Sequence, residues 1–175
     1  MKDSHRRLTK PSIWELKMLR SKLDYQYGRN IGHLIFDEDI LVQRSPRTQR
    51  IREVYSGRKL LAVVRMNDGH ILLSIKGAQI LKSKLAWPAL RVVVMNDVAP
   101  FIAQGRSVYA KHVITLDKKL RAGHDVLVVD ENDRLIALGR LTLSPKEIFE
   151  FSRGIAVRIR KSLGLDKYRS GKNIY

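Results

Sequence analysis

The sequence predicts an α+β fold in two domains, and three observations support this. The chain opens with a helical pattern of apolar residues, continues with short β-branched runs separated by turn signals, and ends with several such runs at the spacing of a small barrel. Its 175 residues suit two small domains. We place the boundary at Ala86–Ala89, which gives an α+β domain over residues 13–88 and a mostly stranded domain over residues 89–164. Basic segments at residues 1–12 and 165–175 are predicted to be flexible.

The first domain is predicted to begin with a helix over residues 13–23. Apolar residues recur there on roughly one helical face, Ser12 can cap the helix, and Glu15 three positions later completes a capping box. Turn signals at Ser56–Arg58 and Asn67–Gly69 separate the β-branched runs that follow. These runs predict strands at 40–42, 51–55, 60–66 and 71–75, followed by a helix over 76–85.

The second domain is predicted to be mostly strand. A short helical turn over 98–104 is expected to end at Gly105. The polar residues 130–133 read as a solvated hairpin loop. The predicted strands are 91–95, 107–115 (with a bend), 125–129, 135–142 and 156–159.

The net charge of +17, with a pI near 10.4, predicts a polyanionic partner such as RNA, DNA or an anionic membrane. Residues 1–89 carry 18 basic and 8 acidic side chains, and residues 90–175 carry 16 and 9, so both halves are basic. The alternative is a generally basic protein without a specific partner. No amphipathic basic helix of convincing length is evident, so a membrane partner is not expected.

Several kinds of chemistry are disfavoured. The chain has no cysteine, which excludes disulfides, thiol catalysis and cysteine-ligated zinc, and which fits a cytoplasmic location. No apolar run reaches the roughly 18 residues of a membrane span, and no secretory signal is evident. The five histidines lack metal-ligand spacing, and neither a phosphate-binding glycine loop nor a nucleophile motif is present. We therefore expect no catalytic residue, no metal and no cofactor.

The glycine spacing of the second half is specific. The characteristic stretches are Val108–Val113 after Gly105, then Leu120–Val128, Ala137–Arg140 and Gly154–Val157. On these residues the second half resembles the PUA family, over roughly residues 90–164. The resemblance implies a pseudo-β-barrel with RNA lying against the loop at Gly105 and the strand after it. For Gly123 and Gly139 we favour ordinary turn chemistry instead.

The first half carries a second resemblance, on Asp24–Gly28, Ser45–Tyr55, Val64–Gly69 and Gly77–Ala78. It resembles the domain that precedes PUA in archaeal tRNA-guanine (archaeosine) transglycosylases, although that family usually has glycine where Gln49 stands. Those enzymes exchange guanine in tRNA on a separate TIM barrel with a catalytic aspartate and a cysteine-ligated zinc. This chain is too short for such a barrel and has no cysteine. The resemblance implies the RNA-binding region of such an enzyme, working with a catalytic transglycosylase subunit.

The candidate RNA-binding residues fall into three groups. Arginines cluster between Arg44 and Arg52, and Arg50 and Arg52 would share a face if a strand begins at Arg50; the alternative is a charged edge strand. A second group lies in the PUA-like half, and a third alternates with Val157 and Ile159. The full predicted set is Arg47, Arg50, Arg52, Arg91, Gly105, Arg106, Lys111, Arg153, Arg158 and Arg160.

Three tyrosines are candidates for stacking on bases, namely Tyr25, Tyr27 and Tyr109. For Tyr25 and Tyr27 we expect buried packing instead. The sequence thus predicts a non-catalytic protein that recognises structured RNA, with the tRNA acceptor stem as the preferred target. The alternative is a PUA-domain factor that binds ribosomal RNA in ribosome assembly or translation. An enzyme with its own tRNA chemistry is disfavoured, because no catalytic constellation is present.

Overall fold

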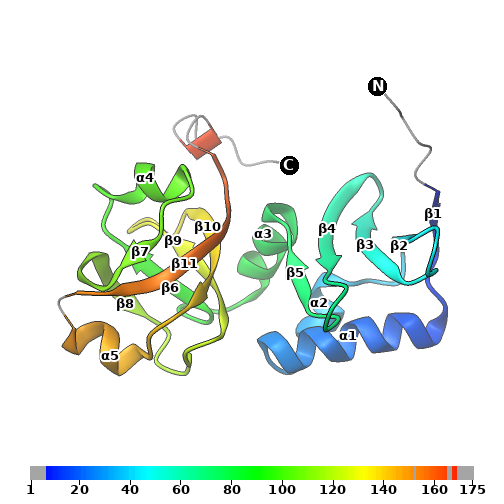
Figure 1. Cartoon of the computed structure of the whole chain (residues 1–175), viewed down its shortest axis with the longest axis horizontal. Helices are drawn as coiled ribbons and strands as arrows, with labels where there is room; N and C mark the ends of the chain where they lie inside the picture. Colours follow the sequence, from blue (N-terminus) through cyan, green and yellow to red (C-terminus); the bar gives the residue numbers. More distant parts are fainter. Residues whose placement is uncertain (1–6, 152, 165–166, 169–175) are drawn as a thin grey trace. The chain divides into compact units, whose positions relative to one another are not determined.

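A computed structural model describes residues 7–151, 153–164 and 167–168 (Figure 1). The chain forms two compact units, residues 1–81 and residues 82–175. The division falls within helix α3 (Ile75–Lys84), somewhat before the boundary that the sequence predicts. Among the described residues, no helix has both the length and the apolar character needed to cross a bilayer.

Helix α1 (Ile13–Tyr27) begins at the predicted capping box. The Ser12 hydroxyl accepts a hydrogen bond from the Glu15 amide, and the Glu15 carboxylate accepts one from the Ser12 amide at 2.8 Å. The helix buries Leu19, Leu23 and Tyr27, which recur every four residues on one face. The predicted helix is therefore confirmed and continues one turn further than the sequence suggested.

The first unit contains a five-stranded antiparallel sheet in the order β1-β2-β3-β4-β5. The short strand β1 pairs Leu8 with Gln43, so this part of the predicted flexible N-terminus is held in the sheet, while residues 1–6 lie outside the described residues. The strands are β1 (Leu8–Thr9), β2 (Ile40–Arg44), β3 (Ile51–Ser56), β4 (Lys59–Val64) and β5 (Ile71–Leu73).

Helix α1 packs on the short helix α2 (Ile31–Ile35) because Gly32 lets their backbones meet. A Cβ atom at Gly32 would lie 2.3 Å from the Arg20 carbonyl oxygen, so only glycine fits there. The Gly32 amide donates to the Asp24 carboxylate at 2.7 Å, and Arg20 Nε donates to the Phe36 carbonyl at 2.8 Å. These bonds fix the corner between α1 and α2.

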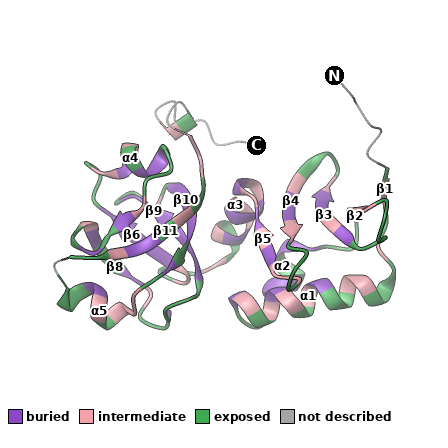
Figure 2. Ribbon diagram, viewed as in Figure 1, coloured by how far each residue is buried: buried purple, intermediate pink, exposed green. Residues whose placement is uncertain are grey.

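The second unit is the predicted pseudo-barrel, built on a six-stranded sheet in the order β7-β11-β10-β9-β6-β8. Strands β6 and β9 run parallel and the other neighbours run antiparallel. Every residue of β6 and β9 is buried, so these two strands form the centre of the core (Figure 2). The strands are β6 (Arg91–Val94), β7 (Val108–Tyr109), β8 (Val113–Leu116), β9 (Asp125–Val129), β10 (Leu135–Leu141) and β11 (Ile155–Ser162).

Short helices cover parts of this sheet. Helix α4 (Ala99–Ala103) contacts β10 and β11, and the 3-10 turn η1 (Ala110–His112) makes the predicted bend between β7 and β8. Helix α5 (Pro145–Glu150) contacts η1 and was not foreseen, although Ser144 and Glu147 form a second capping box that marks its start.

The loop between β9 and β10 is not simply solvated, as the sequence suggested. Asp130 is fully buried and accepts hydrogen bonds from the amide of Asn132 at 3.0 Å and from Nε of Arg134 at 2.7 Å. The Tyr168 hydroxyl donates to the same carboxylate at 3.1 Å. Tyr168 is thus held against the barrel, while residues 165–166 and 169–175 of the predicted flexible C-terminus lie outside the described residues.

Arg91 is a structural residue, which corrects its assignment to the RNA-binding set. Its side chain is 3% exposed, and Nε donates to the Asp133 carboxylate at 2.9 Å. The Nη atoms donate to the carbonyls of Ala89 and Lys82, each at 3.0 Å, and the guanidinium lies 5.6 Å from the Trp87 ring centroid. A guanidinium satisfied in this way has no donors left for a phosphate.

Replacing Arg91 with alanine should therefore destabilise the second unit. Loss of the cation leaves Asp133 with Lys82 as its remaining cationic partner and leaves several carbonyls without their donor, which should cost about 3 kcal/mol. Urea unfolding in a Trp14→Phe background, which leaves Trp87 as the fluorophore, measures this cost. Exposed Arg121→Ala is the control, and equal stability of the two variants would contradict a structural role for Arg91.

Arg44 joins β2 to the start of α1. Its Nη2 donates to the Glu15 carboxylate at 2.9 Å, and Nη1 contacts the second oxygen. This hydrogen bonding from Arg44 is the main reason that the pKa of Glu15 falls from 4.5 to about 2. The folded state therefore favours the charged carboxylate.

The Glu15–Arg44 pair should make stability depend on pH. Because the folded pKa is lowered, the contribution is fully present above pH 4.5 and is lost as pH falls toward 2. We expect wild type to exceed Glu15→Gln by roughly 1 kcal/mol at pH 6, after discounting for partial exposure, with the gap closing in acid. Urea unfolding followed through Trp14 in a Trp87→Phe background tests this. A gap that does not change between pH 6 and pH 2.5 would argue against the ion pair.

Candidate nucleic-acid interface

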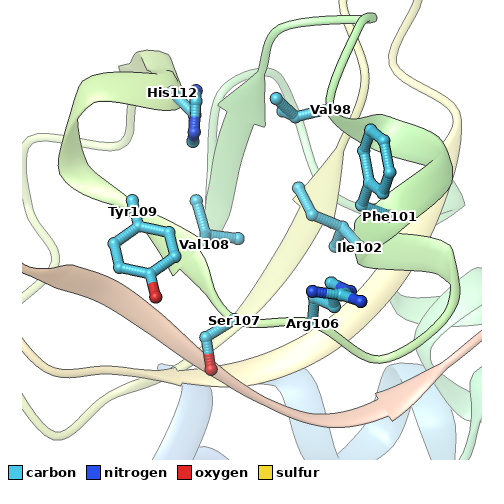
Figure 3. A pocket seen from close by; sticks show the side chains of 8 residues that line it. All are labelled: Val98, Phe101, Ile102, Arg106, Ser107, Val108, Tyr109 and His112. Carbon is cyan, nitrogen blue, oxygen red and sulfur yellow. The ribbon is translucent and has the colours of Figure 1, made fainter.

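A hollow with a volume of about 260 Å³ opens on the second unit beside helix α4 (Figure 3). Helix α4, strand β7 and the turn η1 bring its residues together. Its lining residues are Val98, Phe101, Ile102, Arg106, Ser107, Val108, Tyr109 and His112.

The hollow combines an apolar floor with exposed aromatic walls. Ile102 and Val108 are buried, whereas Phe101 and Tyr109 are 54% and 49% exposed. The Tyr109 and His112 rings meet edge to face, with centroids 6.4 Å apart. Exposed flat rings around a small concavity suit a planar ligand that can stack on them.

Gly105 and Arg106 border this hollow. Gly105 ends the α4 segment with φ of +96°, a conformation that favours glycine, and its amide donates to the Ile102 carbonyl at 2.8 Å. The prediction that the helical turn ends at Gly105 is thus confirmed. Ser162 at the end of β11 lies close to it. Arg106 is exposed, and in the described part of the chain its guanidinium forms no ion pair, so it is available to an anion.

Further cations lie near this hollow or on β11. The Ala110 amide donates to the Gly154 carbonyl at 3.0 Å, which brings the neighbouring exposed residues Lys111 and Arg153 to one region. Along β11, Arg158 and Arg160 are exposed while Val157 is buried, as the predicted alternation requires.

The arginines of the first unit are arranged differently from the prediction. Strand β3 begins at Ile51, so Arg50 precedes the strand and the condition for a shared face with Arg52 is not met. Arg47 and Arg50 are exposed, while Arg52 is half-buried and contacts the sulfur of Met66. Strand β3 lies between β2 and β4, so the alternative of a charged edge strand is also wrong.

Gln49 shapes the turn that carries Arg47 and Arg50. Its φ is +54°, and its amide donates to the Ser45 carbonyl at 2.9 Å. Its side-chain amide donates to the Pro46 carbonyl at 3.0 Å, which helps to hold this conformation. The left-handed backbone explains why glycine suits this position.

Two further predictions need correction. Tyr25 is 94% exposed, so its expected burial is wrong, whereas Tyr27 is buried as expected. Gly139 lies within β10 and not in a turn. A Cβ atom there would lie 2.5 Å from the Val157 side chain, so glycine permits close packing of β10 against β11. Gly123, with φ of +92°, does occupy a turn.

Arg140 is a surface cation that the sequence argument missed. It is the exposed residue between buried Gly139 and Leu141, and its Nε donates to the Gly123 carbonyl at 2.9 Å. The signal that could have found it is this single outward position in a strand that is otherwise buried.

No three His, Asp or Glu side chains within residues 7–151, 153–164 and 167–168 converge as metal ligands.

Two family models match the chain in sequence. The model for the patch-forming domain C2 of tRNA-guanine transglycosylase matches residues 17–88, and the PUA-domain model matches residues 90–163. Together with the pseudo-barrel, these matches show that the chain contains a PUA domain, preceded by a domain that matches the transglycosylase C2 model. More particularly, the chain resembles the C-terminal pre-PUA and PUA region of archaeal tRNA-guanine transglycosylases.

The relatives in sequence are much longer than the part that this chain matches. The chain is 37% identical over 150 residues to the tRNA-guanine(15) transglycosylase of Methanothermobacter thermautotrophicus, covering 86% of this chain and 23% of that protein. The enzyme of the same name from Methanococcus vannielii is 41% identical over 152 residues, covering 87% and 23%. The chain therefore spans less than a quarter of the length of these relatives.

Solved structures share the fold. A hypothetical protein from Pyrococcus horikoshii superposes with a TM-score of 0.71 at 22% identity, covering 89% of this chain and 94% of that one. A conserved PUA-domain protein from Thermoplasma acidophilum superposes with a TM-score of 0.66 at 21% identity, covering 94% and 99%. At this identity the likeness supports the fold alone.

Substituting Gln49 with glycine should stabilise the first unit. Glycine adopts the left-handed conformation without the steric cost that a side chain incurs there. Glycine also loses more backbone entropy on folding than glutamine does, but the relief of the steric cost should exceed that loss by about 0.5 kcal/mol. Urea unfolding followed through Trp14 in the Trp87→Phe background measures the change. Gln43→Gly in strand β2 is the control and should destabilise instead, and a loss of stability in both variants would contradict strain at Gln49.

Proposed function

We propose that this protein binds structured RNA, with the acceptor stem and 3′ end of tRNA as its target, and that it does not itself catalyse a reaction. The observation that carries the proposal is the aromatic hollow beside Gly105 and Arg106, on a PUA domain in a chain of net charge +17. Polyanion attraction alone would not need a shaped apolar concavity.

The hollow suits an unpaired base. A base placed there can stack on the exposed rings of Phe101 or Tyr109, and such stacking is worth about 1–3 kcal/mol per base. His112 adds a polar ring edge, and the forked guanidinium of Arg106 can hold the adjoining phosphate. Single-stranded RNA ends offer bases in the splayed form that this arrangement needs.

The remaining cations would contact the sugar-phosphate backbone. On the second unit these are Lys111, Arg153, Arg158 and Arg160, all exposed. A-form RNA is read largely by its shape and by backbone contacts, which such a dispersed set of cations supplies. On the first unit we propose Arg47, Arg50 and Arg52 as further backbone contacts. Arg91 is excluded because it is buried.

The relatives favour tRNA over other RNAs. The proteins that match are named tRNA-guanine(15) transglycosylases, and this chain corresponds to less than a quarter of their length. We propose that the chain supplies RNA binding to a separate catalytic transglycosylase subunit. Ribosomal RNA is the competing target, and crosslinking in the native cell separates the two: contacts on acceptor stems support the proposal, and contacts concentrated on ribosomal RNA overturn it.

Binding to purified tRNA should depend on the hollow. At about 150 mM salt the protein should prefer tRNA with an intact 3′ end both to tRNA trimmed of its unpaired end and to a DNA duplex of equal length. Tyr109→Ala should weaken tRNA binding by about 1–3 kcal/mol, and Arg106→Gln should also lower the salt dependence by about one counterion. Fluorescence anisotropy with labelled tRNA measures both.

Tyr25→Ala is the matched control, because Tyr25 is also an exposed tyrosine but lies on α1 in the other unit. Its tRNA affinity should remain at the wild-type level. Equal affinity of wild type for tRNA and DNA would reject the proposed function, and equal losses in Tyr25→Ala and Tyr109→Ala would reject the hollow as the site.

A further inference from the structure

Strands β10 and β11 place two arginines directly opposite each other. In their antiparallel register Arg140 is the partner of Arg158, and both residues are exposed. Side chains at directly opposed positions project from the same face of a sheet, with Cβ atoms roughly 5 Å apart. The two side chains therefore project from one face of the sheet, and neither of them lines the aromatic hollow.

Neither arginine of this pair, Arg140 nor Arg158, forms an ion pair in the described part of the chain, and Arg160 follows two positions along β11. On β9, Asp125 is the register partner of Arg140, and its side chain is buried. Like charges placed directly opposite destabilise a sheet, so the pair costs stability unless an anion lies between them.

Arg140 is also held in place. Its Nε donates to the Gly123 carbonyl at 2.9 Å, which leaves the Nη donors available. The Gly123 turn is itself tied to the end of β10, because its amide donates to the Leu141 carbonyl at 2.7 Å and the Leu141 amide donates to the His124 carbonyl at 2.8 Å. A guanidinium fixed by its own turn loses little entropy when it binds an anion. The same loop adds exposed Lys118, Lys119 and Arg121.

We propose that Arg140 and Arg158 clamp a phosphate of the RNA backbone, as a site separate from the aromatic hollow. Two arginines whose Cβ atoms lie about 5 Å apart can both donate to one phosphodiester, and the basic loop beside Arg140 continues the contact along a polyanion. This inference rests on the proposed function, since the phosphate it names belongs to the bound RNA. It assigns Arg140 a role that charge and spacing in the sequence do not indicate.

The binding test compares Arg140→Gln/Arg158→Gln with Arg58→Gln/Lys59→Gln, which removes the same charge from the exposed β3–β4 turn. The clamp variant should bind tRNA at least tenfold more weakly at 150 mM salt, with a salt dependence lower by about one counterion, while the control changes less than threefold. Each single substitution should lose nearly as much as the double, because a clamp needs both arms. Arg140→Lys/Arg158→Lys should restore the salt dependence without restoring full affinity.

Thermal unfolding without RNA supplies an independent readout. Arg158→Gln should raise the melting temperature at low salt because it removes the like-charge contact, whereas a structural arginine would lower it. A lowered melting temperature, or equal tRNA binding by the clamp and control variants, overturns the clamp. If wild type does not prefer tRNA to DNA, the proposed function is rejected. If wild type prefers tRNA but the clamp variants bind tRNA as tightly as the control variant, only the clamp is rejected.

Discussion

The second unit depends on the buried guanidinium of Arg91. Taking a charge out of water is costly, and the fold offsets that cost by giving the side chain a carboxylate at Asp133 and several backbone carbonyls. The carbonyl partners lie at the end of α3 and in the segment that leads into β6, whereas Asp133 lies in the β9–β10 hairpin. One side chain therefore fixes the entry of the chain into the barrel and the position of a distant loop. The same loop is fixed again by Asp130, which is buried among its own donors.

The surface is basic because the chain has twice as many basic as acidic side chains, and several of the carboxylates are already paired. Glu15 binds Arg44, Asp68 binds Arg65, Asp130 binds Arg134, and Asp133 binds both Arg91 and Lys82. With 34 Lys and Arg against 17 Asp and Glu, there is a carboxylate for only half of the cations. Among the described residues, the structure gives Arg106 and the arginine pair on β10 and β11 defined surroundings.

A cation in a specific structural environment can form a binding site, whereas a basic surface alone attracts any polyanion. Arg106 borders a concavity with exposed rings, where an unpaired base and its phosphate can be held together. Arg140 and Arg158 oppose each other across two strands, where a single anion relieves their repulsion. The two proposed sites would bind different groups of an RNA: the first requires an unpaired base, and the second requires only a phosphate. Such a combination favours an end of a folded RNA over a uniform duplex.

The sequence by itself determined the local features: the α1 capping box, most of the strands, the glycine at the end of the α4 segment, and the alternation along β11. Each depends on residues a few positions apart, so spacing suffices to predict it. Only the tertiary structure decided which side chains from distant segments meet. It buried Arg91, exposed Tyr25, and placed Gly139 between packed strands. The register of β10 and β11 places Arg140 opposite Arg158. The sequence could not predict this pairing, because composition and periodicity indicate which face of an element is buried but not which residue lies opposite on the next strand.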